Sequence, residues 1–116
     1  MTILEIAVYV AVLSGASPMV CHLQDSATTL CSNGTLVKAI SANSVRFGDG
    51  TVIQREGGEF PVFSTGLKSS LSGNGWLVFG NGVGIRRDGR TAYVFNNGLV
   101  CRTELPDLIT CAKPAS

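Results

Sequence analysis

The chain has 116 residues, enough for at most one domain. Nine basic and eight acidic side chains nearly cancel, which argues against strong electrostatic binding to nucleic acid or to an anionic membrane. Only 15% of the residues are charged and 14 are glycine, a composition typical of an apolar, turn-rich chain with few long helices.

The N-terminal segment is apolar. Residues 3–13 are interrupted only by Glu5, and the small residues before Ser17 fit a signal-peptidase site. The lack of Lys and Arg departs from that pattern, and the run is short for a transmembrane helix, which needs about 20 residues. We expect residues 1–16 to be an export signal or another apolar N-terminal segment, with an uncleaved membrane anchor and a buried structural segment as the alternatives. Residues 17–116 are expected to form a single β-repeat domain.

A repeat of 16 residues organises the rest of the chain. Cys31 and Cys111 occupy the same repeat position as four phenylalanines, which are Phe47, Phe63, Phe79 and Phe95. Three residues after this position in five successive units comes a glycine, namely Gly34, Gly50, Gly66, Gly82 and Gly98. A tandem period without insertions determines the architecture before any single residue does.

Each unit is expected to hold two short strands. The Gly-Asp-Gly turn before Thr51 places Gly50 where positive φ is needed, and it pairs Phe47 with Thr51 and Val45 with Ile53. A second turn falls halfway through each unit, near Ala42-Asn43, Gly57-Gly58, Gly73-Asn74-Gly75, Asp88-Gly89 and Leu105-Pro106-Asp107. The sequence predicts an all-β fold of tandem 16-residue repeats in an antiparallel hairpin meander. A β-solenoid, with the phenylalanines stacked as an internal ladder, is the alternative.

The two faces of the predicted strands differ. Odd-numbered positions are apolar, and even-numbered positions mix charged residues with four valines, which are Val62, Val78, Val94 and Val100. These valines form either an interaction strip or a surface covered by arginine stems.

The four cysteines follow the same period. Cys21 and Cys31 are ten residues apart, as are Cys101 and Cys111, and the two pairs are separated by five periods. The repeat therefore favours two disulfides that close the terminal units, where a repeat array lacks a neighbour. Such bridges imply an oxidising compartment outside the cytosol. Free buried thiols and a zinc site are the alternatives, although zinc ligand pairs are usually closer in sequence.

The sequence contains no familiar catalytic motif. His22 lies beside Cys21 and is expected at the surface. Glu56 and Glu59 flank a glycine turn, where they are either solvated carboxylates or an acid pair that binds a cation or serves an enzyme. We expect no enzymatic activity, no cofactor and no metal site.

Three residues are candidates for contact with a partner: Trp76, Arg86 and Arg102. Trp76 is the only tryptophan and is predicted to be partly exposed. Arg86 and Arg102 share a repeat column with Lys38, which forms either a row for an anionic polymer or a device against edge-to-edge aggregation.

The stretches Gly75-Trp76-Leu77-Val78-Phe79-Gly80-Asn81-Gly82 and Arg90-Thr91-Ala92-Tyr93-Val94-Phe95-Asn96-Asn97-Gly98 resemble bacterial cell-wall-binding hairpin repeats. That family binds choline or glycan between aromatic side chains of adjacent hairpins. The similarity covers about a third of the chain, and this chain has a shorter period and fewer aromatic residues. The resemblance implies a similar architecture and assigns no binding residue.

The sequence thus predicts a non-enzymatic, exported interaction or structural module. We expect it to be an accessory subunit or a building block of a cell-envelope or surface assembly, with a protein partner or self-assembly. A glycan- or cell-wall-binding module is the alternative. Nucleic acid is not an expected partner, and membrane contact is expected only through residues 1–16 if they are not cleaved.

Overall fold

The computed structural model describes residues 1–55 and 60–114. Within them lie one helix and twelve strands: α1 (Ile3–Leu13), β1 (Met19–Asp25), β2 (Thr28–Cys31), β3 (Leu36–Ser41), β4 (Ser44–Phe47), β5 (Val52–Gln54), β6 (Val62–Phe63), β7 (Ser69–Leu71), β8 (Leu77–Phe79), β9 (Gly84–Asp88), β10 (Ala92–Phe95), β11 (Val100–Leu105) and β12 (Leu108–Ala112).

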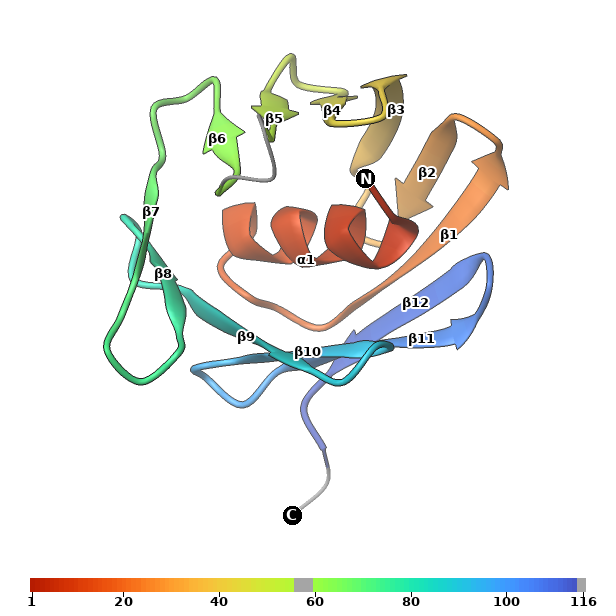
Figure 1. Ribbon diagram of the computed structural model, residues 1–116. Helices are drawn as coiled ribbons and strands as arrows, with labels where there is room; N and C mark the ends of the chain where they lie inside the picture. The colour runs from red at the N-terminus through yellow and green to blue at the C-terminus, as the bar shows by residue number, and fades with distance from the viewer. Residues whose placement is uncertain (56–59, 115–116) are drawn as a thin grey trace.

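The strands form one antiparallel sheet that curls into a nearly closed, barrel-like shape (Figure 1). Its order is β6-β5-β4-β3-β2-β1-β12-β11-β10-β9-β8-β7. Consecutive strands are neighbours everywhere except at β6 and β7, and the only neighbours among the described strands that are not consecutive are β1 and β12. β1 pairs with β12, with Met19 opposite Cys111, and β6 and β7 are the two ends of the sheet. The prediction of an all-β hairpin meander is confirmed, and the solenoid alternative is wrong.

The repeated glycine turn has the predicted geometry. Gly50 has a φ of 95°, and its N–H donates to the carbonyl oxygen of Phe47 at 3.0 Å. The Phe47 N–H donates to the Thr51 carbonyl oxygen at 2.7 Å, and the Asp49 carboxylate accepts the Thr51 N–H at 2.9 Å. These local bonds fix the register, so Val45 lies opposite Ile53. The same offset places Leu77 opposite Ile85 and Tyr93 opposite Cys101.

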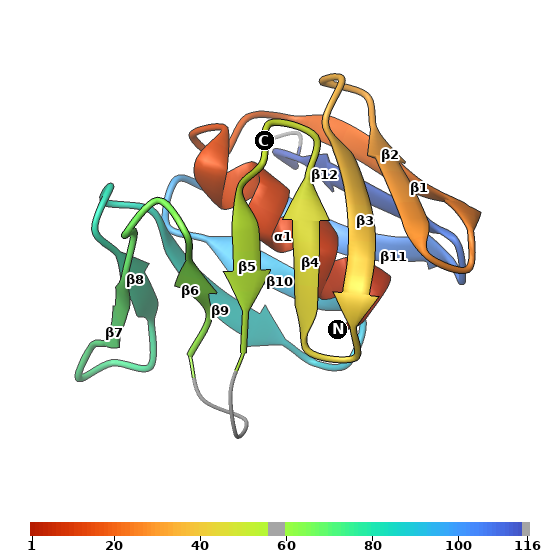
Figure 2. The same cartoon turned by 90° about the horizontal axis from the view of Figure 1, so that it is seen from above.

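Helix α1 fills the interior of the sheet, with strands on both sides of it (Figure 2). Thr2 begins the helix in a capping box with Glu5, and the residues from Leu4 to Val12 are all buried. A helix that is apolar on every side has no face suited to water and is stable only when it is enclosed. The structure therefore uses this segment as core, and cleavage before Ser17 would remove that core from the domain.

The phenylalanine column packs around this helix. Phe47, Phe63, Phe79 and Phe95 are each at most 4% exposed. The Phe63 ring makes edge-to-face contacts with Tyr9 of α1 and with Phe79, with centroid separations of 6.1 and 5.7 Å. The repeat position that the sequence singles out is thus the position that contacts the central helix.

Both predicted disulfides are present. Cys21 bonds to Cys31 with an S–S distance of 2.01 Å, and Cys101 bonds to Cys111 at 2.08 Å. They join β1 to β2 and β11 to β12, so the bridged hairpins are the two that meet where β1 pairs with β12. Two disulfides that use all four cysteines suggest an oxidising environment.

Candidate functional site

The open seam between β6 and β7 is the clearest irregularity of the sheet. Among the described residues, β6 pairs only with β5 and β7 only with β8. Every other neighbouring pair of strands is joined by a ladder, so the backbone edges facing the seam lack the partner strand that the others have. Such edges pair readily with another strand.

The seam has a cause in the sequence. The repeat would place Pro61 opposite Ser69, as it places Val45 opposite Ile53. In the ladder between β4 and β5, the Phe47 N–H donates to the Thr51 carbonyl oxygen. Hydrogen-bonded and non-hydrogen-bonded pairs alternate along an antiparallel ladder, so the pair two residues away, Val45 and Ile53, is also of the hydrogen-bonded type. Pro61 would occupy the position of Val45 in such a pair. Proline has no N–H to donate, and it is tolerated at sheet edges for that reason. The residue thus marks the place where the sheet ends.

Apolar side chains are exposed along this seam. Phe60, Val62 and Leu71 are 45%, 55% and 62% exposed. Phe60, Val62, Lys68 and Ser69 help line a hollow of about 260 Å³ there. The Ser69 hydroxyl is buried and has no hydrogen-bond partner within residues 1–55 and 60–114. The seam therefore combines free strand edges, exposed apolar side chains and an unsatisfied hydroxyl.

The three contact residues predicted from the sequence do not share one concave site. Arg102 helps line a hollow of about 210 Å³ beside β11 and β12, and neither Trp76 nor Arg86 belongs to its lining. Trp76 is half-buried, and the Arg86 guanidinium lies 4.8 Å from its ring centroid. Arg102 is exposed on β11, across β10 from Arg86 on β9. One face of the tryptophan is thus in contact with a cation, which leaves less of it for a sugar or another partner.

Lys38, Arg86 and Arg102 share a repeat position, but the sheet places Lys38 far from the two arginines. Lys38 lies on β3, opposite Arg46 on β4. Strands β2, β1 and β12 separate it from Arg102 on β11. The three residues therefore do not form one row for a polymer.

The valine strip is also interrupted. Val94 and Val100 are opposite each other on β10 and β11 and are half-buried, whereas Val62 is exposed on β6 at the seam. Arg86 is opposite Val94 on its other side, which fits coverage by an arginine stem.

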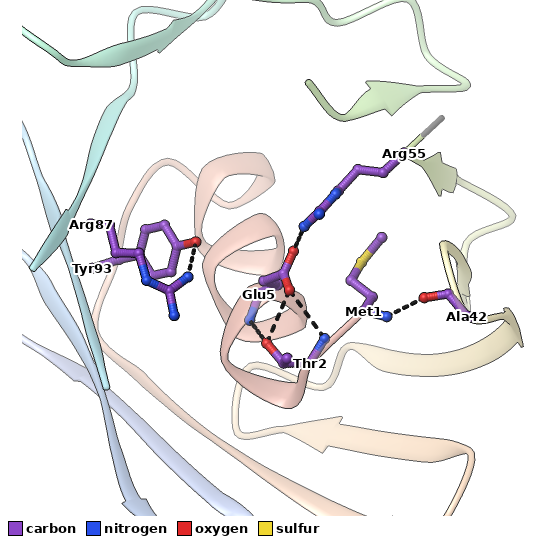
Figure 3. A network of polar contacts seen from close by, with 7 residues as sticks. All are labelled: Met1, Thr2, Glu5, Ala42, Arg55, Arg87 and Tyr93. Carbon is purple, nitrogen blue, oxygen red and sulfur yellow. Dashed lines mark hydrogen bonds and ion pairs between the residues drawn. The ribbon is translucent and has the colours of Figure 1, made fainter. Parts of the chain in front are cut away.

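Around the N-terminal end of α1, polar contacts hold the helix to the surrounding strands and turns (Figure 3). The Met1 amino group donates to the Ala42 carbonyl oxygen, and the Glu5 carboxylate forms an ion pair with Arg55 while it caps the helix. The predicted acid pair Glu56 and Glu59 lies outside the described residues. The contacts in this network anchor the start of the helix.

A second group beside this network also has a structural role. The Arg87 guanidinium donates to the Tyr93 hydroxyl at 2.9 Å and lies 5.2 Å from the centroid of that ring (Figure 3). It also donates to the carbonyl oxygens of Gly89 and Arg90. These bonds tie the β9–β10 turn together.

At the opposite end of the barrel-like sheet, glycine turns surround the C-terminal end of α1. On one side, the side-chain amides of Asn81 and Asn97 donate to the carbonyl oxygens of Val12 and Ala16, each at 3.0 Å. On the other side, the helix and the turns before β3 and β5 enclose a pocket of about 530 Å³. The sequence did not predict this pocket, because the pocket depends on where the helix lies.

Asp49 is the charged residue in the lining of this pocket. Hydrogen bonds from the Thr51 backbone N–H, and then from its hydroxyl, hold the pKa of the Asp49 carboxyl below its usual value. The equivalent residues of the other turns are Asn33, Thr65, Asn81 and Asn97. The charge at this repeat position therefore occurs in one turn alone.

The described residues contain no cluster of three or more His, Cys, Asp or Glu side chains arranged to hold a metal ion. His22 is exposed on β1, as expected. Within the same residues, no helix has both the length and the apolar character needed to span a membrane. No family model, curated protein or solved structure matches the chain.

Proposed function

We propose that this protein is a non-enzymatic, exported module that works by association, as a building block of a cell-envelope or surface assembly. The open seam between β6 and β7 carries this proposal. It exposes Phe60, Val62 and Leu71 beside two free strand edges, where the repeat would otherwise continue the sheet. Exposed apolar patches and free edges are typical of interaction sites in soluble domains.

Export is supported by the two disulfides. Each joins neighbouring strands, and together they use all four cysteines of the chain. Cytosolic proteins rarely keep structural disulfides, because the cytosolic thiol pool reduces them. The disulfides also stabilise the two hairpins that meet where β1 pairs with β12.

Self-association is the form of the proposal that can be tested directly. A strand edge of a second copy would pair with the free edge of β7 or β6 and cover the adjacent apolar side chains. We expect the oxidised protein to form dimers or larger species as its concentration rises. Multi-angle light scattering across a concentration series measures this.

Charged substitutions at the seam locate the interface. Val62→Lys and Leu71→Lys should shift the protein to monomer without changing its unfolding midpoint, because both side chains are already exposed. Ile40→Lys is a matched control, since Ile40 is 54% exposed on β3, away from the seam. A wild-type protein that stays monomeric at all concentrations, or equal effects of all three substitutions, would overturn the assignment of the seam to self-assembly.

A further inference from the structure

We infer that the pocket between the C-terminal end of α1 and the turns before β3 and β5 binds an alkylammonium group, with the cationic head at Asp49 and the hydrocarbon stem on the apolar wall. This site is separate from the seam and goes beyond the proposed assembly function. Its ligand class follows from the shape, the lining and the charge of the pocket.

The pocket has an apolar floor and a polar rim. Val10 and Phe47 are buried at 1% and 4% exposure and belong to its lining, together with the half-buried Leu13 and Leu36. Asn33, Thr35 and Asp49 come from the surrounding turns. At about 530 Å³ it is within the usual size range of small-molecule sites, which pair apolar walls with a few polar groups.

The electrostatics of the pocket favour a cation. Asp49 is a carboxylate held in its ionised form by Thr51, and the residues that line the pocket include no Lys or Arg. The C-terminal end of α1, which carries partial negative charge, reaches the same pocket at Leu13 and Ser14, and its last turn has no basic residue. Because Asn81 and Asn97 already donate to the carbonyl oxygens of Val12 and Ala16, Asp49 is the main source of negative potential in the pocket.

The charge of Asp49 is not required by the turn. In the equivalent turns, Asn33 and Asn97 accept the same backbone N–H bond that Asp49 accepts, at 3.0 Å in each case. The turn therefore forms equally well with an amide. Asp49 forms this turn bond as they do, and in addition it places a negative charge at the rim of the pocket.

Titration of the oxidised protein with hexylamine tests the site, with backbone amide shifts followed by ¹H–¹⁵N NMR. We expect saturable shifts confined to residues 33–36 and 47–49 and to the end of α1. Hexanol and hexanoate share the stem without the cation and should bind at least about fivefold more weakly. Equal binding of the three compounds, scattered shifts, or no saturation would overturn the inference.

Asp49→Asn provides the decisive variant, since the neighbouring turns already use asparagine. It should weaken hexylamine binding by about fivefold and leave the unfolding midpoint unchanged. Asp25→Asn is the matched control, because Asp25 accepts a similar turn bond from Ala27 at 2.9 Å but lies outside the pocket lining. Equal effects of the two substitutions on binding would contradict the site.

Two sources of this chemistry can be separated with the same assay. A free amine and a lysine side chain of another protein both present an alkylammonium group. If Nα-acetyl-lysine amide produces the same shifts as hexylamine, the site accepts a protein side chain. If only the free amine does so, the ligand is a small molecule. If neither hexylamine nor Nα-acetyl-lysine amide binds, the proposal is overturned.

Discussion

The side-chain amide of Asn97 donates to the carbonyl oxygen of Ala16 at 3.0 Å, across 81 residues of sequence. The same side chain accepts the Leu99 N–H at 3.0 Å, so one residue both closes its own turn and anchors the end of the central helix. The repeated turn is thus an attachment point for the helix as well as a connection between strands.

Asn97→Asp separates these two roles. The carboxylate still accepts the Leu99 N–H, but it no longer donates to Ala16 and it places a negative charge beside that carbonyl oxygen. We expect the free energy of unfolding to fall by about 1–2 kcal/mol, measured by urea denaturation. Asn33→Asp is the control, since the bond recorded for its side chain is the turn bond to Thr35, and it should be nearly neutral. Equal losses would mean that the anchor contributes nothing.

The glycines of the turns are required by their backbone conformation. Gly98 has a φ of 92°, and an added Cβ would meet no atom within 4 Å. Gly98→Ala should therefore destabilise the protein by about 1–2 kcal/mol through backbone strain alone. Gly73, which has equal space and no positive φ, is the matched site for comparison. Thermal unfolding of Gly73→Ala should change little, and a similar loss in both variants would refute the strain argument.

The disulfides should contribute to stability separately. Each closes a sequence separation of ten residues, which corresponds to about 3 kcal/mol in the chain-entropy description. Replacement of Cys21 and Cys31 together by Ala should lower the urea midpoint, and hydrogen exchange should become faster in β1 and β12. A reductant should lower the wild-type midpoint further and leave a variant that lacks all four cysteines unchanged. A wild-type midpoint that does not respond to reductant would contradict this role.

Tyr9 makes the fold sensitive to alkali. Burial, with a smaller contribution from Tyr93, raises the pKa of the Tyr9 phenol well above its ordinary value of 10.0. The unfolded chain therefore loses this proton at lower pH than the folded protein. The associated stability is complete below pH 10 and is lost as the pH rises through the folded pKa.

The Tyr9→Phe variant isolates this effect. Urea midpoints measured from about pH 9 to about pH 11.5 should fall less steeply for the variant than for the wild type. Both proteins carry the same disulfides, so alkaline damage to those bonds affects them equally. Parallel pH profiles would show that Tyr9 ionises as freely in the folded protein as in the unfolded chain.

The register of the sheet could be predicted because it depends on local constraints. A glycine at positive φ, preceded by Asn, Asp or Thr, fixes one turn of each repeat, and the second turn follows at a constant spacing from it. Val45 therefore lies opposite Ile53, and Cys21 opposite Cys31, as the period alone indicates. The disulfide pairing followed from the same rule.

The closure of the sheet could not be predicted in the same way. A 16-residue period specifies how each strand meets the next, and it carries no information on whether β1 meets β12. The position of α1 was ambiguous for a related reason, since a uniformly apolar stretch suits an export signal and an enclosed helix equally. The pocket at Asp49 depends on both features and was missed with them.

The seam did have a signal in the sequence. Pro61 occupies a repeat position whose backbone N–H belongs to the ladder, and a proline there marks an edge. Only after the register is laid out does this residue stand apart from its equivalents Val45, Leu77 and Tyr93. Reading prolines against the hydrogen-bonding pattern of a repeat would have located the opening.

The enclosed helix has a consequence for how the protein is made. Residues 3–13 are synthesised before the strands of the sheet that covers them, and the hairpin of β11 and β12 that completes this cover follows about a hundred residues later. During that interval the complete sheet that buries this apolar segment does not yet exist. Until its final hairpin emerges, the nascent chain therefore exposes an aggregation-prone apolar segment, the kind of surface to which chaperones bind.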